Sequence, residues 1–263
     1  MKLEQAIIID QTKVSGGYRL LQLKAPLISS EVQPGQFVHI RLPSPEDTLL
    51  RRPFSVFRAD SPGLDILYKP VGRGTTAMLD LLPGHSLNLI GPLGKGFPRP
   101  SADSLPVLIA GGYGIAALYM LARSCVSPGL AFFGGAQSAD ILCVDDFIRL
   151  GWDVRIATEN GSLGVQGLVT APLDLWLQQE RGDRRIEAFA CGPNGMLRAV
   201  ADRAATGNWR AWVSIDRNMG CGVGACLTCV QKIQSADGGW TWKRVCKEGP
   251  VFDSRLVIWE GTS

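Results

Sequence analysis

The feature that most constrains this chain is a cysteine- and glycine-rich stretch at residues 219–229, MGCGVGACLTC. Cys221, Cys226 and Cys229 lie in it, and Cys246 completes the spacing C-x4-C-x2-C-x16-C. This is the plant-type spacing of a [2Fe–2S] cluster, in which four thiolates hold two irons. The three glycines of the stretch allow the close backbone approach that such a loop needs.

A four-cysteine zinc site and a pair of disulfides are the alternatives. Zinc sites usually show two separated C-x2-C knuckles, and here only Cys226 and Cys229 form one. Cys125, Cys143 and Cys191 lie outside the pattern and make seven cysteines in all. An odd number without a secretory signal favours reduced thiols. The pattern predicts an iron–sulfur site, with a zinc-bearing scaffold without redox function as the alternative.

Length and charge exclude several classes of protein. A chain of 263 residues indicates two or three domains. Its net charge is +3, without a basic stripe interleaved with aromatics, so no nucleic-acid partner is expected. The apolar run near the amino terminus is too short for a signal peptide or a membrane span. We therefore expect a cytoplasmic protein that does not contact membranes.

Residues 1–100 predict an antiparallel β-barrel. Short strand-like runs alternate with Pro and Gly and show little helical periodicity. The expected strands are 5–9, 18–23, 36–42, 54–57, 64–69 and 86–90. One helix is expected, at 75–82.

Residues 101–208 alternate between strand and helix, which predicts a doubly wound parallel sheet with helices on both faces. The expected strands are 106–110, 130–134, 153–157 and 186–190, and the expected helices are 115–123, 139–150, 169–180 and 194–204. Residues 209–263 form a small third domain, which is too short to fold without its metal.

The barrel carries the stretch RRPFS at 51–55, followed by LYK at 67–69 and GRGTT at 72–76. Paired arginines are often only solvated, but a guanidinium offers a fork of donors that matches phosphate oxygens. The glycine stretch can present backbone N–H groups to the same diphosphate. Tyr68 is as well explained by the core as by a cofactor stack.

Two glycine motifs mark the α/β domain. AGGYGIAA at 110–117 satisfies G-x-G-x-x-A and exposes a helix N-terminus to a phosphate. ACGPNGM at 190–196 ends a strand on the sheet edge where such folds bind ligands. The alternative for each is a plain structural turn. The acidic residue of the common dinucleotide fingerprint is missing, since position 132 is Phe.

Together these motifs resemble one family. RRPFSV, LYKPVGRGT, GPLGKGF, AGGYGIAALY, ACGPNGM and the four spaced cysteines before EGPVF occur in the order typical of the electron-transfer subunits of dihydroorotate dehydrogenase B. The likeness runs from about residue 3 to 259. That family belongs to the ferredoxin reductase superfamily, which implies a flavin-binding barrel, a nicotinamide-binding α/β domain and, here, a carboxyl-terminal [2Fe–2S] domain.

The resemblance implies roles at matching positions. It implies FAD contacts for Arg52, Pro53, Phe54, Ser55, Leu67, Tyr68, Lys69, Gly74 and Thr75. Arg52 is expected to contact the diphosphate, and Ser55 is expected to lie near the isoalloxazine ring. It implies that Cys221, Cys226, Cys229 and Cys246 ligate the [2Fe–2S] cluster.

The wider superfamily implies the nicotinamide contacts. Gly111, Gly112 and Gly114 are expected to flank the dinucleotide, and Cys191 is expected near the nicotinamide ring. Relatives commonly carry proline where this chain has Ala117.

The kind of nicotinamide depends on the second strand of the α/β domain. NADP-dependent relatives often carry an arginine after this strand. Gln137 stands there, which favours NAD, with Arg149 and Arg155 as alternative partners for a 2′-phosphate.

The resemblance also implies the function. An FMN-containing partner oxidises dihydroorotate, and electrons pass through [2Fe–2S] and FAD to NAD+ in pyrimidine (UMP) biosynthesis. The partner resembles a (β/α)8 barrel of about 250 residues, so this chain is expected to act on dihydroorotate only with that subunit, in a heterotetramer of two each. The alternative is an NAD(P)H-dependent FAD/[2Fe–2S] reductase that serves an oxygenase, a hydrogenase or a sulfite reductase.

Four further residues complete the expectations. Trp240 and Trp242 follow a turn and are candidates for the partner interface, with packing over the cluster as the alternative. The two histidines, His39 and His85, fit no ligand pattern and are expected to be structural.

Overall fold

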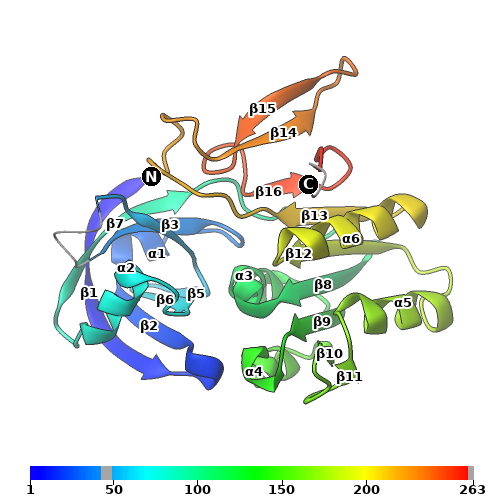
Figure 1. The fold of residues 1–263 in the computed structure, drawn as a ribbon, viewed down its shortest axis with the longest axis horizontal. Helices are drawn as coiled ribbons and strands as arrows, with labels where there is room; N and C mark the ends of the chain where they lie inside the picture. The colour runs from blue at the N-terminus through cyan, green and yellow to red at the C-terminus, as the bar shows by residue number, and fades with distance from the viewer. Residues whose placement is uncertain (43–48, 260–263) are drawn as a thin grey trace.

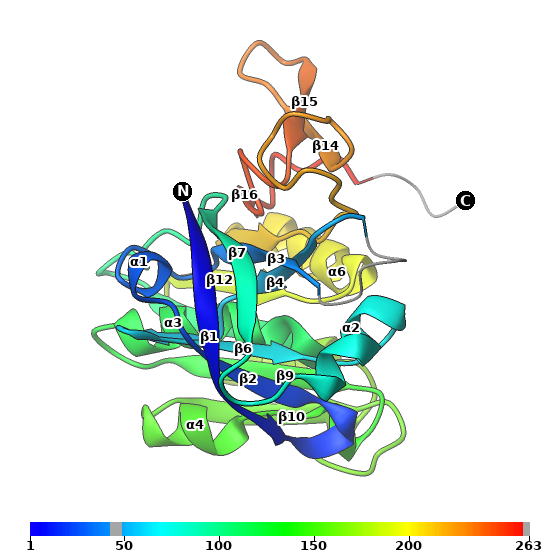
Figure 2. The same cartoon turned by 90° about the vertical axis from the view of Figure 1, so that its left-hand side faces the viewer.

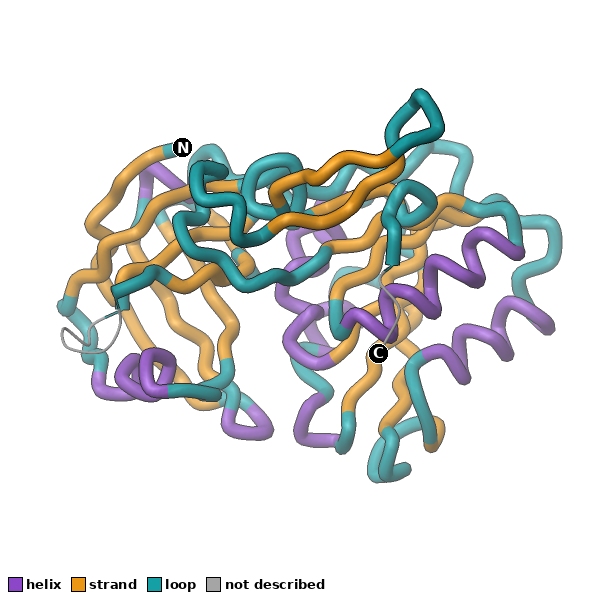
Figure 3. Tube along the Cα trace, turned by 45° about the horizontal axis from the view of Figure 1, so that its top comes forward, coloured by secondary structure: helices purple, strands orange, loops and turns teal. Residues whose placement is uncertain are grey.

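The computed structural model of this chain describes residues 1–42 and 49–259. Figure 1 shows an antiparallel sheet from the amino-terminal part beside an α/β sheet from the central part. A two-stranded hairpin from the carboxyl-terminal part lies over both (Figures 2 and 3). This arrangement is the expected sequence of barrel, α/β domain and small third domain.

The first sheet has the strand order β4-β3-β7-β1-β2-β6-β5, with every pair antiparallel. Its strands are β1 (Lys2–Lys13), β2 (Arg19–Lys24), β3 (Phe37–Arg41), β4 (Arg52–Ser55), β5 (Arg58–Asp60), β6 (Gly63–Tyr68) and β7 (Ser86–Leu93). Phe54 of β4 and Tyr68 of β6 meet edge to face at 6.2 Å between ring centroids. Because these strands lie near opposite ends of the order, the sheet curls back on itself around an apolar core.

Short elements of the barrel differ from the expectation. Strand β5 and helix α1 (Pro26–Ser29) were not expected. The α1 turn forms because the Glu4 carboxylate accepts hydrogen bonds from Leu27 N and Ile28 N at 3.0 and 2.9 Å. The expected helix at 75–82 is instead α2 (Arg73–Ala77) followed by the 3₁₀ turn η2 (Met78–Asp80).

The second sheet has the order β11-β10-β9-β8-β12-β13-β16. Its strands are β8 (Leu105–Gly111), β9 (Leu130–Gly135), β10 (Asp153–Thr158), β11 (Val165–Gln166), β12 (Ile186–Cys191), β13 (Arg210–Ser214) and β16 (Val251–Asp253). All pairs are parallel except β13 with β16. The strand order reverses at β8, between β9 and β12, which makes the edge after β8 and β12 the usual ligand site of such sheets.

Helices cover both faces of this sheet, as expected for a doubly wound fold. They are α3 (Ile115–Ser124), α4 (Val144–Arg149), α5 (Thr170–Gln179) and α6 (Asn194–Thr206). Leu108 and Ala110 of β8 pack with α3 and α4. The alternate residues Val107 and Ile109 pack with α5 and α6. The two-residue period of a strand therefore sends successive side chains of β8 to opposite helix layers.

The expected helix at 139–150 is wrong in its first half. The chain forms a 3₁₀ turn, η4 (Ser138–Asp140), and α4 begins only at Val144. Cys143 between them has φ of +55°, outside the right-handed helical region. Ile141 and Leu142 are buried in this extended segment, so packing outweighs the local helical preference.

The third part contributes strands β13 and β16 to the second sheet. Residues 215–250 leave after β13 and return at β16, with β14 (Val230–Gln234) and β15 (Trp240–Arg244) as an antiparallel hairpin between them. Cys229 and Cys246 belong to the same apolar cluster as residues of α5 and α6. None of the helices in the described residues combines the length and apolar character that a membrane crossing requires.

Candidate functional site

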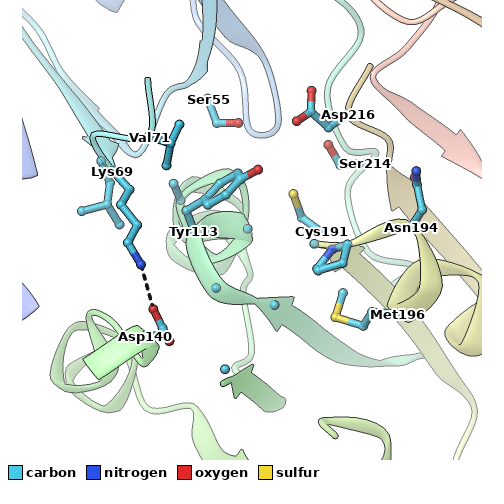
Figure 4. A pocket seen from close by; sticks show the side chains of 18 of the residues that line it. Ser55, Lys69, Val71, Tyr113, Asp140, Cys191, Asn194, Met196, Ser214 and Asp216 are labelled. Carbon is cyan, nitrogen blue, oxygen red and sulfur yellow. Dashed lines mark hydrogen bonds and ion pairs between the residues drawn. The ribbon is translucent and has the colours of Figure 1, made fainter. Parts of the chain in front are cut away.

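A cleft of about 1250 Å³ lies between the barrel and the α/β domain (Figure 4). From the barrel it is lined by residues 52–55 and 67–69 and by Gly74 and Thr75. From the α/β domain it is lined by Gly111, Gly112, Gly114 and Cys191. The structure thus gathers every residue expected to contact FAD or nicotinamide around one cavity.

The two adjacent arginines of the barrel have different surroundings. Arg51 turns to strand β7, where its Nη1 donates to Asn88 O at 2.8 Å and its Nη2 donates to the Asn88 side chain. Arg52 lines the cleft, and its Nη1 donates to Leu50 O at 2.9 Å. The first arginine therefore braces the barrel, and the second is the one available to a diphosphate.

Tyr68 belongs to the barrel core and to the cleft wall at once. The residue is 3% exposed and packs in the barrel's apolar cluster. Its hydroxyl donates to Gln11 Oε1 at 2.8 Å, and burial raises its pKa to about 12. The ring is therefore fixed and neutral where it borders the cavity.

Thr75 organises the glycine loop before α2. Its Oγ1 accepts hydrogen bonds from Val71 N at 2.9 Å and Gly72 N at 3.2 Å, and donates to Gly72 O at 3.1 Å. The hydroxyl thus closes the loop on itself. Its contribution to the site is the shape of a loop that borders the cleft.

Glycines bring the two loops at the topological switch point into contact. A Cβ on Gly114 would lie 2.1 Å from Cys191 O, and one on Gly111 would lie 2.7 Å from Pro193 Cδ. A Cβ on Gly192 would lie 2.9 Å from Gly111 N. Any side chain at these positions would force the loops after β8 and β12 apart, which explains both glycine motifs physically.

Cys191 lines the cleft next to Ser214, its partner on the neighbouring strand (Figure 4). Burial raises the pKa of the Cys191 thiol to about 12. Burial also raises the pKa of Asp216, which follows β13. Tyr113 reaches into the cleft from the turn before α3 (Figure 4). The neutral thiol offers a small, uncharged surface for a ring rather than a nucleophile.

One ion pair joins the two walls. Lys69 Nζ of the barrel lies 3.2 Å from Asp140 Oδ1 of η4 (Figure 4). The same ammonium lies 4.7 Å from the Tyr18 ring centroid, and the Tyr18 hydroxyl donates to Asp140 at 3.4 Å. Lys69 therefore links the barrel to the α/β domain and also lines the cleft between them.

Tyr113, Asp140 and Asp216 line the cleft but were not predicted from the sequence. Asp216 follows a parallel strand at its carboxyl end, a signal that could have identified it. Arg149 and Arg155, the alternative partners for a 2′-phosphate, pair with Asp146 and Glu180 and do not line the cleft.

The four spaced cysteines form two pairs. Cys221 N donates to Cys226 Sγ and Cys226 N donates to Cys221 Sγ, both at 3.4 Å. Cys246 N donates to Cys229 Sγ, also at 3.4 Å. All four are free thiols. Two thiol pairs fit a cluster in which each of two irons takes two thiolates.

The thiols of Cys226 and Cys246 differ in acidity. Hydrogen bonds from the Thr228 hydroxyl, and then from the backbone of Cys221 and Thr228, lower the pKa of Cys226 to about 6. Burial and the neighbouring Cys229 thiol raise the pKa of Cys246 to about 12. In the described residues, no three His, Cys, Asp or Glu side chains converge as the ligands of a single ion would.

Arg244 braces the cysteine loop. Its Nη1 donates to Gly224 O at 2.8 Å, and its Nε donates to Glu248 Oε2 at 3.0 Å. The carboxylate also accepts from Arg244 N at 2.7 Å. The guanidinium lowers the pKa of Glu248 to about 2. This pair connects β15 to the loop between Cys221 and Cys226.

Comparison with known proteins agrees with this description. Residues 216–258 match the family described as the iron–sulfur cluster binding domain of dihydroorotate dehydrogenase B. The chain is 38% identical over 266 residues to the dihydroorotate dehydrogenase B (NAD(+)) electron transfer subunit of Desulforamulus reducens, covering 98% of this chain and 99% of that one. It is 34% identical, with the same coverage, to the subunit of that name from Bacillus mycoides.

Solved structures share the fold. An NADH-dependent reduced ferredoxin-NADP oxidoreductase studied for flavin-based electron bifurcation superposes with a TM-score of 0.84 at 26% identity, over 97% of this chain and 90% of that one. The ferredoxin reductase in carbazole 1,9a-dioxygenase gives a TM-score of 0.67 at 20% identity, over 79% and 66% of the two chains. With its ferredoxin reductase fold and its iron–sulfur domain, the chain belongs to the family of dihydroorotate dehydrogenase B (NAD(+)) electron transfer subunits.

Proposed function

We propose that this chain holds FAD in the interdomain cleft and a [2Fe–2S] cluster on its four spaced cysteines, and connects a dihydroorotate-oxidising FMN subunit with NAD+. When bound, the flavin exchanges a hydride with nicotinamide and the cluster carries single electrons, so the flavin converts between the two. The observation that carries the proposal is that both glycine loops, the RPFS strand and the LYK strand end border one cavity.

The barrel residues bind and orient the flavin. Arg52 meets the diphosphate, because it is the one of two adjacent arginines that lines the cavity. Pro53, Phe54, Ser55 and residues 67–69 form the wall against the ring, and the loop closed by Thr75 supports the diphosphate. A buried, hydrogen-bonded Tyr68 gives that wall a fixed shape.

The α/β residues bind the nicotinamide. Gly111, Gly112 and Gly114 leave the backbone before α3 open to the dinucleotide, and Cys191 packs against the ring. NAD is the favoured form, because the acidic Asp140 and Glu159 are the charged residues that this domain contributes to the cleft. A dianionic 2′-phosphate would meet like charge there.

Cys221, Cys226, Cys229 and Cys246 hold the cluster. Backbone N–H groups of Cys221, Ala225, Cys226 and Cys246 donate to cysteine sulfurs. Such donors orient thiolates and set the reduction potential.

The partner is expected to dock beside the cluster. Trp240 is 53% exposed and Trp242 is 47% exposed, on one face of β15. Lys232 Nζ lies 4.8 and 5.2 Å from their ring centroids. Exposed tryptophans are typical anchors of protein interfaces. We assign this face to the FMN subunit, in a complex of two copies of each chain.

We assign the barrel to residues 1–100, the α/β domain to 101–208 and the third part to 209–263. Strands β13 and β16 of the third part pair within the sheet of the second. Seven free thiols suit a reducing compartment, which supports a cytoplasmic location.

The test is dihydroorotate-dependent NADH formation by this chain combined with its FMN partner, compared with each subunit alone. The proposal expects NADH only from the combination. If the combination oxidises dihydroorotate with an artificial acceptor but forms no NADH, the proposed route is wrong. If the chain contains FAD and the cluster but exchanges electrons with another partner, the cofactor assignment stands and the dihydroorotate assignment is wrong.

A further inference from the structure

His39 lies on β3 of the barrel but does not belong to the barrel core. Its neighbours Val38 and Ile40 point into that core, and the two-residue period of a strand turns His39 to the other face. A polar side chain on the outer face of a barrel is normally solvated. His39 is nevertheless 0% exposed.

The cysteine loop is what covers this histidine. A Cβ on Gly222 would lie 2.2 Å from His39 Nδ1 and 2.7 Å from its Cε1, so the ring rests directly on the backbone at that glycine. Gly222 follows the ligand Cys221, and its φ of +70° turns the loop at this point. The imidazole of His39 is therefore a point of contact between the barrel and the cysteine loop.

The same histidine also adjoins the flavin motif. In the ladder between β3 and β4, His39 stands opposite Pro53, the proline of the RPFS stretch. Pro53 lines the cleft proposed for FAD. His39 therefore contacts the cysteine loop at Gly222 and also pairs with β4, which carries the RPFS stretch.

Neither ring nitrogen of His39 makes a hydrogen bond of normal geometry among the described residues, although the backbone of Cys221 and of Arg51 lies close to the ring. An imidazole carries at least one N–H donor in any protonation state. Buried polar groups are almost always paired, because an unpaired donor retains its full desolvation cost. The acceptor that satisfies this ring is therefore expected in the group that the neighbouring loop binds.

We propose that His39 is a positioning residue of the iron–sulfur site, whose buried N–H donates a hydrogen bond to a sulfur atom of the bound cluster and fixes the loop to the flavin barrel. This rests on the proposed function, since it requires that the four cysteines hold the cluster. A donor aimed at sulfur stabilises the reduced form, which carries more negative charge, and so raises the reduction potential.

The test is an EPR-monitored redox titration of the purified chain, with its native cluster and without its partner. His39→Phe keeps an aromatic ring of similar size and removes the donor. His39→Gln keeps an N–H donor. His85→Phe is the matched control. His85 accepts a hydrogen bond from Leu82 N in a turn of the barrel, whereas it is His39 that contacts the cysteine loop at Gly222.

We expect His39→Phe to make one-electron reduction of the cluster about tenfold less favourable, a shift of about 59 mV to lower potential. His39→Gln should recover part of this shift, and His85→Phe should leave the potential unchanged. If His39→Phe keeps its iron and sulfide and the potential does not move, the ring only packs on Gly222 and the inference is wrong.

A second measurement covers the case in which His39→Phe fails to retain a cluster. In the His85→Phe protein grown with ¹⁵N-histidine, His39 is the single labelled residue, since the chain has two histidines. The reduced cluster should then show a ¹⁵N hyperfine coupling, and its absence would overturn the hydrogen bond. A wild-type chain without iron and sulfide would contradict the proposed function instead, so the two failures are distinguishable.

Discussion

Single glycines decide where separate parts of this chain touch. Gly114 lets the loop before α3 meet the backbone of Cys191, and Gly222 lets the cysteine loop meet His39. The sequence indicates close backbone approach for the glycines of the cysteine stretch, and for Gly114 a turn that exposes a helix N-terminus. It could not indicate the second surface, because that surface lies far away in the chain and is brought near only by tertiary packing.

Gly222→Ala should cost more stability than the same change at Gly238. Both glycines have positive φ, +70° and +82°, so alanine is strained by roughly 1–2 kcal/mol at either position. A Cβ at Gly222 also collides with His39, whereas a Cβ at Gly238 has no neighbour within 4 Å. We expect Gly222→Ala to lower both iron content and thermal midpoint relative to Gly238→Ala. Equal losses in the two variants would show that His39 does not hold the loop.

At the residue scale, motifs that fix both residue type and spacing name residues that the structure brings together, while their cofactor contacts stay predictions. The cleft residues of RPFS and LYK and the paired cysteines are of this kind. His39 was expected to be merely structural, because no spacing relates it to the cysteines more than 180 positions away. Asp140 lay in a segment that was expected to be helical, so its place beside Lys69 was not foreseen.

At the scale of elements, long periodic segments were predictable and short ones were not. Helices α3, α5 and α6 match their expected ranges within three residues at either end. Helix α1 depends on a carboxylate from β1, and the break before α4 depends on two buried residues, so neither has a local signal. Tertiary contacts decide such elements.

The hairpin β14–β15 is expected to protect the cluster loop through Arg244. Arg244→Met removes the donor to Gly224 O and leaves the Glu248 carboxylate without its main partner. We expect a chelator to remove iron from this variant severalfold faster than from the wild type, measured by loss of visible absorbance. Lys243→Met is the control on the adjacent position. If iron is lost at the same rate from Arg244→Met and Lys243→Met, the contacts of Arg244 do not protect the cysteine loop.

At the scale of the whole molecule, the third part is not an independent domain. Its strands β13 and β16 pair within the α/β sheet, and Cys229 and Cys246 share a core with α5 and α6. The sequence suggested that residues 209–263 need metal to fold. Because of this shared core, we expect only the cysteine loop and the β14–β15 hairpin to need the metal for folding.

Removal of the cluster should therefore loosen the molecule locally. We expect hydrogen exchange of the metal-free chain to rise at 219–229 and in β14–β15, because the ligand thiols lose the group that crosslinks them. Strands β13 and β16 should keep their protection, since their hydrogen bonds belong to the sheet. Loss of protection throughout 209–258 would mean that the third part folds as one metal-dependent unit.

The exposed tryptophans should matter only in the complex. Trp240→Ala combined with Trp242→Ala is expected to weaken binding of the FMN partner by roughly tenfold or more, as truncation of aromatic anchors does. The isolated variant should keep its iron and FAD content. Val126→Ala is the matched control, because Val126 is fully exposed on the α/β domain. Unchanged affinity in a titration of the two subunits would move the interface elsewhere.

The most direct test of the central claim is the EPR spectrum of the purified chain, without its partner, after anaerobic addition of NADH. If one chain holds FAD between the barrel and the nicotinamide site and a [2Fe–2S] cluster on Cys221, Cys226, Cys229 and Cys246, NADH should produce the paramagnetic signal of a one-electron-reduced cluster. Cys226→Ser should lose this signal and still oxidise NADH with a two-electron acceptor. Bleaching of the flavin without any cluster signal in the wild type, or zinc without acid-labile sulfide, would contradict the account.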